Sequence, residues 1–450
     1  MNIENVLLAI TLANIFFLST GLAGIDFGYA AEICAVLLLG VLLFGAKRFF
    51  KSLIVFFMRS KSAVLIAMAV YLSVDATNFF IFGDLALAWQ KYRVVGVLIL
   101  LFASLCILRH RPNFIKLILL VVGLSSVVVS IYSLAYYFLP IRLPLFYTAR
   151  FSMRRDYNMY ATQLIVGFIA LVFGVIATKN KKAMIALMAA LPVIVAVSIL
   201  SGSRRVLIML PVVLPVAALS FAAAGIRLFG ARQTGAVIGC LAVITGLTIA
   251  ETVLFRYGLA QINTPGSPTR SVAPSSGVET QLSARYETIR SSSILEKRKI
   301  IWGIAIEEIS KYSVPSLVFG WGGGKNISLY DEISAPLDAI YPDRQARLGA
   351  LSAHNMMLAD LLDGGVIKLI ALLYLIFASG ISCIMLALKR PFIGLPLGMI
   401  LAVCMVNSMV SNRFGLLYDR YFVLFAAMVA IEYQIAKVLT HDQQIGGNSR

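Results

Sequence analysis

The sequence predicts an all-α polytopic membrane protein with about 12 transmembrane helices and one large extramembrane loop that contains short helices. Three observations predict this class. Hydrophobic residues make up 60% of the 450 residues and charged residues only 13%. The mean hydropathy is +0.89, and apolar runs of about 18 or more residues recur along the chain. This composition excludes a soluble globular protein of the same size.

Apolar windows of about 19 residues locate the predicted spans. In chain order they cover residues 6–24, 27–45, 62–82, 94–108, 114–139, 160–177, 183–200, 206–224, 234–254, 356–387, 392–411 and 418–438. The predicted domains are therefore transmembrane helices 1–9 in residues 1–254, a loop domain in residues 255–355, and helices 10–12 with a tail in residues 356–450.

Compact basic loops follow every even-numbered span and fix the predicted orientation. Examples are Arg48, Arg109, Lys181, Arg227 and Lys389. Because Lys and Arg accumulate in cytoplasmic loops, these loops and both termini are expected in the cytoplasm. The odd-numbered spans then end on the outer side, where the large loop also lies.

The short outer loops are rich in arginine, although positive charge is usually avoided on that side. A guanidinium presents a planar fork of donors that matches phosphate oxygens and keeps its charge. This enrichment predicts a phosphate ligand at the outer face. The arginines are Arg142, Arg150, Arg154, Arg155, Arg204, Arg205 and Arg413.

A simpler interpretation is that such arginines contact lipid phosphates or extend from helix ends toward the surface. It explains the adjacent pairs Arg154–Arg155 and Arg204–Arg205 less well, since neighbouring cations repel unless an anion lies between them. Asp156 offers part of that charge to the first pair.

The loop domain contains one strong helix signal. Ser293 and Glu296 have capping-box spacing, and the pattern predicts a helix to about Tyr312, with Pro315 and Gly320 ending it. Arg298 and Trp302 share a face of this helix, because they are four residues apart. The Gly-rich run 319–326 lacks the spacing of a phosphate-binding loop and predicts a tight backbone turn.

His354 is the one histidine predicted on the outer side, since His110 and His441 fall on the cytoplasmic side. Imidazole titrates near neutrality, so His354 is the candidate general base. Ser352 is the predicted N-cap of the tenth span, which places His354 in the first turn. The alternative is an interfacial histidine that only caps the helix or binds a headgroup.

No metal site is predicted, because no His or Cys cluster has metal-ligand spacing. The five cysteines all fall within apolar spans. Asp75 lies inside a span, where a carboxylate is costly, but no chemistry is assigned to it. Asp419, beside Arg420, is interpreted as an ion-pair partner, an arginine-orienting group or a second proton acceptor.

Several motifs over roughly residues 200 to 370 together resemble the bacterial O-antigen ligase and O-antigen polymerase superfamily. Lys368 departs from that resemblance, since a small or aromatic residue is common there. The motifs are Ser201-Gly-Ser-Arg204, Arg298 with Trp302, Pro315 with Gly320-Trp-Gly322, and His354-Asn355 with Gly365.

The resemblance implies a glycosyltransferase of the bacterial inner membrane that uses no metal or other cofactor. It would transfer a glycan from undecaprenyl pyrophosphate to a sugar hydroxyl of lipid A-core, on the periplasmic face. His354 and Asn355 would be catalytic, and the pyrophosphate would be bound by Arg204, Arg298, Arg154, Arg155, Arg285 and Arg290. Supporting roles would fall to Arg205, Trp302 and Asp419.

Three alternatives stay open at this point. A repeat-unit polymerase needs the same donor but a second lipid-linked glycan as acceptor, and a ligase could instead modify a pilin or other protein. From another class, a lipid-linked oligosaccharide flippase would also bind pyrophosphate. Transporters commonly show repeated halves and charges at the midplane, whereas this sequence shows no repeat and gathers its arginines at one surface.

Overall fold

The computed structural model is helical, and no strand occurs among the residues it describes. These residues lie in the ranges 3–22, 29–45, 62–83, 85–111, 113–138, 157–177, 181–201, 209–216, 293–332, 352–411 and 419–447, with a few single positions and short pieces between them.

Among the described residues, five helices are long and apolar enough to cross a membrane. They are α1 (Ile3–Leu22), α4 (Ala63–Phe82), α6 (Phe114–Phe138), α16 (Met356–Lys389) and α17 (Pro391–Ser411). The predicted all-α membrane class is confirmed at this level.

Five further helices correspond to predicted spans. They are α2 (Ala30–Phe44), α5 (Leu85–Leu108), α7 (Tyr157–Ala177), α8 (Lys181–Leu200) and α18 (Arg420–Gly447). The predicted spans 206–224 and 234–254 lie mostly outside the described residues. The total of twelve spans therefore stays a prediction.

Two helices extend nine residues beyond their predicted ends. Helix α5 begins at Leu85 rather than at residue 94, so Lys91, which precedes the predicted span, lies within the helix. Helix α18 continues to Gly447, past the predicted end at residue 438. A hydropathy window ends where polar residues begin, although the backbone hydrogen bonds of the helix continue through them.

The chain divides into two compact units. One contains residues 1–11, 35–111 and 292–450, and the other contains residues 12–34 and 112–291. In the first unit, α16 packs against α17, α4 and α18. In the second, α6 packs against α7 and α7 against α8, and a buried contact of 2.7 Å joins the hydroxyls of Ser133 and Tyr160 between α6 and α7.

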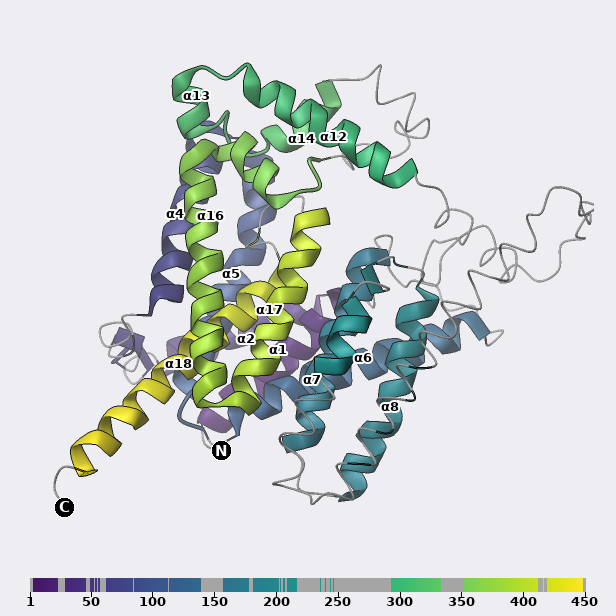
Figure 1. Cartoon of the computed structure of the whole chain (residues 1–450). Coiled ribbons are helices and arrows are strands. Elements are labelled where there is room, and N and C mark those ends of the chain that lie inside the picture. Colours follow the sequence, from purple (N-terminus) through teal and green to yellow (C-terminus); the bar gives the residue numbers. More distant parts are fainter. Residues whose placement is uncertain are drawn as a thin grey trace, which may run out of the picture. The chain divides into compact units, whose positions relative to one another are not determined.

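Three helices cover one end of α16 in the first unit, as Figure 1 shows. They are α12 (Ser293–Ser310), α13 (Val314–Phe319) and α14 (Lys325–Glu332), and together we call them the cap. Helix α12 confirms the helix predicted from Ser293. Pro315 was predicted to end that helix, but it lies in the first turn of α13, a position where its missing N–H costs no hydrogen bond.

Candidate functional site

Helix α16 is broken at Gly365, and the Gly-rich turn of the cap binds at the break. Gly365 has φ 64° and ψ −161°. The amide of Trp321 donates to the Leu362 oxygen at 3.2 Å, and that of Gly322 donates to the Asp363 oxygen at 2.9 Å. These donors satisfy carbonyls that the broken helix cannot pair itself. The predicted tight turn is confirmed, since Gly320, Gly322 and Gly324 have positive φ.

Close packing at the break requires glycine on both sides. A Cβ atom at Gly365 would lie 2.5 Å from the Val318 oxygen, and one at Gly320 would lie 2.4 Å from the Asp363 oxygen. Both residues also have positive φ, which side chains disfavour. Gly320 and Gly365 belong to two of the motifs that resemble the O-antigen ligase and polymerase superfamily. In the structure these two glycines lie against each other.

His354 lies in a turn, residues 352–355, directly before α16. Its φ is 47°, and Asn113 is the one other non-glycine residue with positive φ in the described part of the chain. Its amide donates to Ser352 Oγ at 3.3 Å. Such backbone conformations cost energy and cluster at functional sites. We call this segment the His354 turn.

Asn355, not Ser352, caps α16. Its Oδ1 accepts from the Met357 amide at 2.9 Å and from the Leu358 amide at 3.3 Å. The prediction that Ser352 is the N-cap was wrong, and His354 precedes the cap instead of lying in the first helical turn. Asparagine is as good an N-cap as serine. The two hydrogen bonds of this N-cap use the carboxamide oxygen of Asn355.

Helix α12 is joined to the His354 turn by a side chain. Trp302 Nε1 donates to the Ala353 oxygen at 3.1 Å, and Ala353 is fully buried in an apolar cluster with Ile301 and Leu362. Arg298 lies one helical turn before Trp302 on α12, about 6 Å along the axis. The structure thus places two predicted site residues, Arg298 and Trp302, on the helix that packs on the His354 turn.

The structure describes one of the six other arginines predicted for the site. Arg205 is buried and belongs to the second unit. Near it, Ser203 Oγ donates to Asn158 Oδ1 at 3.0 Å and joins the end of α8 to α7. The others lie outside the described residues. They are Arg154, Arg155, Arg204, Arg285 and Arg290.

Asp419 has a structural role at the start of α18. Its Oδ1 accepts from the amides of Tyr421 and Phe422, each at 3.1 Å. This is the geometry of a helix N-cap, and a carboxylate there also interacts favourably with the positive end of the helix.

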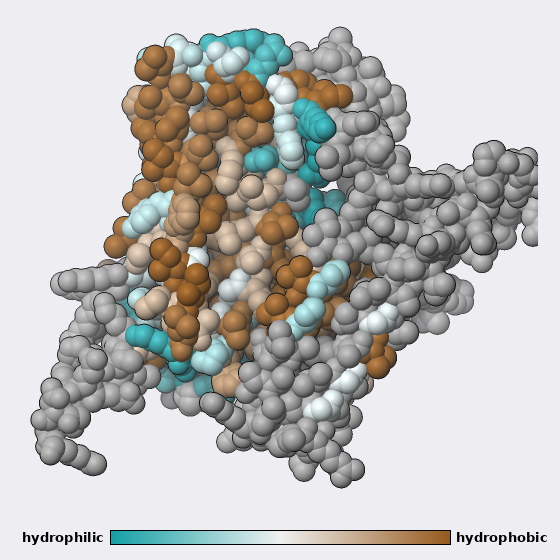
Figure 2. Space-filling view, in the orientation of Figure 1, coloured by the Kyte–Doolittle hydropathy of each residue, from teal (hydrophilic) through white to brown (hydrophobic). Residues whose placement is uncertain are grey.

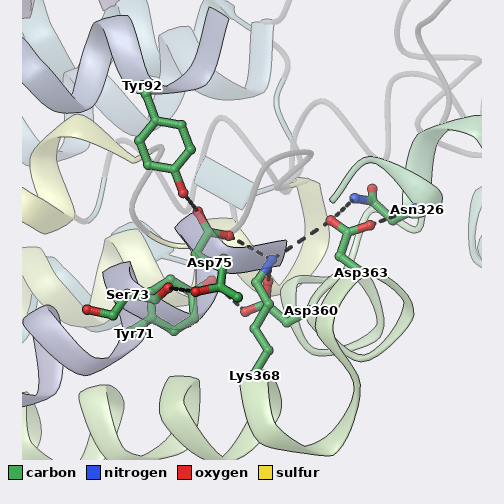
Figure 3. Close-up of polar contacts among 9 residues, drawn as sticks. Tyr71, Ser73, Asp75, Tyr92, Asn326, Asp360, Asp363 and Lys368 are labelled. Carbon is green, nitrogen blue, oxygen red and sulfur yellow. Dashed lines mark hydrogen bonds and ion pairs between the residues drawn. The ribbon is translucent and has the colours of Figure 1, made fainter. Parts of the chain in front are cut away.

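A cluster of buried charges, drawn in Figure 3, includes Asp360 of α16, six residues after His354. Lys368 Nζ is 2.7 Å from Asp75 Oδ1, 3.2 Å from Asp360 Oδ1 and 3.9 Å from Asp363 Oδ2. All four side chains are at most 3% exposed. We call these four residues the aspartate–lysine cluster.

Neutral donors complete the cluster. Tyr71 donates to Asp360 at 2.6 Å and Tyr92 to Asp75 at 2.7 Å, as Figure 3 shows. Asn326 of α14 donates to Asp363 through Nδ2 at 2.7 Å and through its amide at 2.9 Å. Buried carboxylates require such partners.

The cluster and its neutral donors connect four elements across the break in α16. Asp360 and Asp363 precede Gly365 and Lys368 follows it, while Asp75 belongs to α4, Tyr92 to α5 and Asn326 to α14. Together they therefore fix the first turns of α16, which follow the His354 turn, relative to α4 and the cap.

Sequence reasoning missed this cluster, although signals for it exist. Asp75 was noted as a costly carboxylate within a span, and Lys368 as the departure from the resembled family. Asp360, Asp363 and Lys368 are three and five residues apart in an apolar helix, so two or more share a face. Among the described residues, no group of three or more His, Cys, Asp or Glu side chains could hold a metal ion.

No protein-family model matches the sequence, and no curated protein shows significant similarity to it.

Proposed function

We propose that this protein is a membrane glycosyltransferase that transfers a glycan from undecaprenyl pyrophosphate to a sugar hydroxyl of lipid A-core at the periplasmic face. The observation that supports this proposal most directly is the hydrogen bond from Trp302 to the Ala353 oxygen. It ties the helix that bears Arg298 to the turn that bears His354, so a phosphate-binding group and a proton acceptor belong to one packed region.

In the proposed reaction, a hydroxyl oxygen of the acceptor attacks the anomeric carbon of the donor glycan. The bond between that carbon and the pyrophosphate oxygen breaks, and undecaprenyl pyrophosphate leaves. His354 takes the hydroxyl proton. The energy of the sugar–pyrophosphate bond drives the transfer, so no nucleotide is needed at the outer face.

Arg298 stabilises the charge that develops on the leaving pyrophosphate. A guanidinium held in place lowers the barrier when it binds the transition state more strongly than the ground state. Arg204, Arg154, Arg155, Arg285 and Arg290 remain predicted pyrophosphate ligands, with Arg205 in support.

Asn355 has two proposed tasks. Its Oδ1 caps α16, and its Nδ2 orients His354 or a sugar hydroxyl. The aspartate–lysine cluster acts only through position, because its buried side chains stabilise the segment on which the His354 turn is built. A rigid second layer of this kind keeps catalytic groups in register.

The second candidate is a lipid-linked oligosaccharide flippase. The buried aspartate–lysine cluster favours it, since ionisable residues within membrane helices often line ion or substrate pathways. Transporters commonly show two related halves, however, and this sequence shows no internal repeat, so the transferase remains first.

Purified protein in detergent tests the proposal, because transport cannot be scored there. Undecaprenyl-pyrophosphate glycan is mixed with lipid A-core in one reaction and supplied alone in another. Product with lipid A-core supports the ligase, whereas elongation of the donor alone identifies a repeat-unit polymerase. Absence of product in both, with donor still bound, rejects transfer to these acceptors and favours the flippase.

A further inference from the structure

Helix α13 has an apolar surface that the described residues of its unit leave exposed. None of its residues is buried. The side chains of Val314 and Phe319 are 76% and 57% exposed, and Trp321, just after the helix, is 56% exposed. Water disfavours so many large apolar groups on one short segment.

This surface adjoins the exposed apolar side of α16. Helix α13 packs on α16, whose exposed apolar residues recur at spacings of three and four and continue along the helix. Figure 2 shows the hydrophobic surface of α16 extending up to α13. The residues on this face of α16 are Ile367, Ile370, Tyr374, Phe377, Ile381 and Ile384.

Polarity changes sharply at the two ends of α13. Before it, Lys311 and Glu307 form an exposed ion pair at 2.9 Å. After it, Lys325 Nζ lies 6.0 Å from the Trp321 ring. Exposed Trp with a neighbouring Lys is typical of the headgroup level of a bilayer, where an aromatic body meets a polar layer.

We propose that α13 and Trp321 insert into the bilayer on the cap side, at the boundary between phospholipid headgroups and acyl chains. The occupant of this surface is phospholipid, because the surface continues the membrane-facing side of α16. The amides of Trp321 and Gly322 bind the break in α16, so insertion of α13 also fixes the depth of the cap. This inference does not depend on the proposed glycan transfer.

Spin labels test the insertion in the full-length protein, reconstituted in vesicles of phosphatidylethanolamine and phosphatidylglycerol. Cysteines for labelling are introduced singly as Leu317→Cys and Phe319→Cys, with Lys311→Cys as the aqueous control. The unsubstituted protein is labelled in parallel to subtract signal from native cysteines. Power saturation compares collisions with oxygen, which concentrates in lipid, and with a water-soluble nickel chelate.

We expect oxygen to relax the labels at positions 317 and 319 more strongly than the nickel chelate, and the order to reverse at position 311. Two labelled positions keep the test informative if one variant does not fold. Nickel-chelate accessibility at 317 and 319 equal to that at 311 would overturn the proposal. Neither outcome bears on whether the protein transfers a glycan.

Discussion

The indole nitrogen of Trp302 donates a hydrogen bond to the carbonyl oxygen of Ala353, the residue immediately before His354. One side chain thereby joins α12 to the turn that carries the proposed general base. Arg298 is one helical turn away on the same helix, so the position of α12 affects both groups.

Trp302→Phe removes this hydrogen bond and keeps an aromatic ring. We expect the unfolding free energy to fall by about 1 kcal/mol and the transfer rate to fall by up to about 100-fold, because small displacements of catalytic groups are costly. Tyr330→Phe is the matched control, since it removes the bond from Tyr330 to the Ile301 oxygen within the cap. Burial raises the pKa of Tyr330, so its phenol keeps the proton that it donates. A similar rate loss in both variants would show that the Trp302 bond has no special role.

Asn355→Ser separates capping from chemistry. Serine caps helices about as well as asparagine, so we expect the unfolding free energy to change by only a few tenths of a kcal/mol. The serine lacks the amide N–H groups, and loss of one hydrogen bond to His354 or the sugar should reduce the transfer rate by roughly tenfold. Denaturant titration and transfer assays measure the two effects. A wild-type rate would restrict Asn355 to capping.

Lys368→Met leaves three buried carboxylates without their cation. Breaking a buried ion pair on one side costs about 3–5 kcal/mol, and we expect a loss of that size in denaturant titrations in micelles. Adding Asp75→Asn should recover part of it, because the two substitutions remove the same interaction. A Lys368→Met protein as stable as the wild type would contradict the role given to the cluster.

Gly365→Ala tests the break in α16. Gly365 has a backbone conformation, φ 64° and ψ −161°, that essentially only glycine adopts and that costs an alanine about 1–3 kcal/mol, and the added Cβ would meet the Val318 oxygen. Gly380→Ala in the same helix is the control, since no atom lies within 4 Å of its added Cβ. We expect the control to be stabilised by up to about 1 kcal/mol. Equal midpoints of thermal unfolding for the two variants would mean that the break is not required.

Hydropathy was sufficient to locate most helices of the described chain. Helix α6 at Phe114–Phe138 corresponds to the span predicted at residues 114–139, because a bilayer requires long apolar runs that are visible in the sequence. Helix α14 was not predicted, since its eight residues are mostly polar. Its position depends on tertiary bonds such as that from Asn326 to Asp363, which local sequence does not reveal.

The sequence predicted the surroundings of the candidate site only in part. Residue type alone made His354 and Arg298 candidates, and capping preferences identified the start of α16 to within a few residues. The choice between Ser352 and Asn355 as N-cap depends on the turn geometry. The aspartate–lysine cluster depends on α4 and α16 meeting, although Asp75 and Lys368 are 293 positions apart in the sequence.

The most direct test of the central claim compares wild-type protein with His354→Ala in single-turnover glycan transfer, alongside binding of the undecaprenyl-pyrophosphate donor. We expect the rate to fall by about 100- to 10,000-fold, with the donor dissociation constant nearly unchanged. An unaltered transfer rate in the purified His354→Ala protein would contradict the role of His354 as general base.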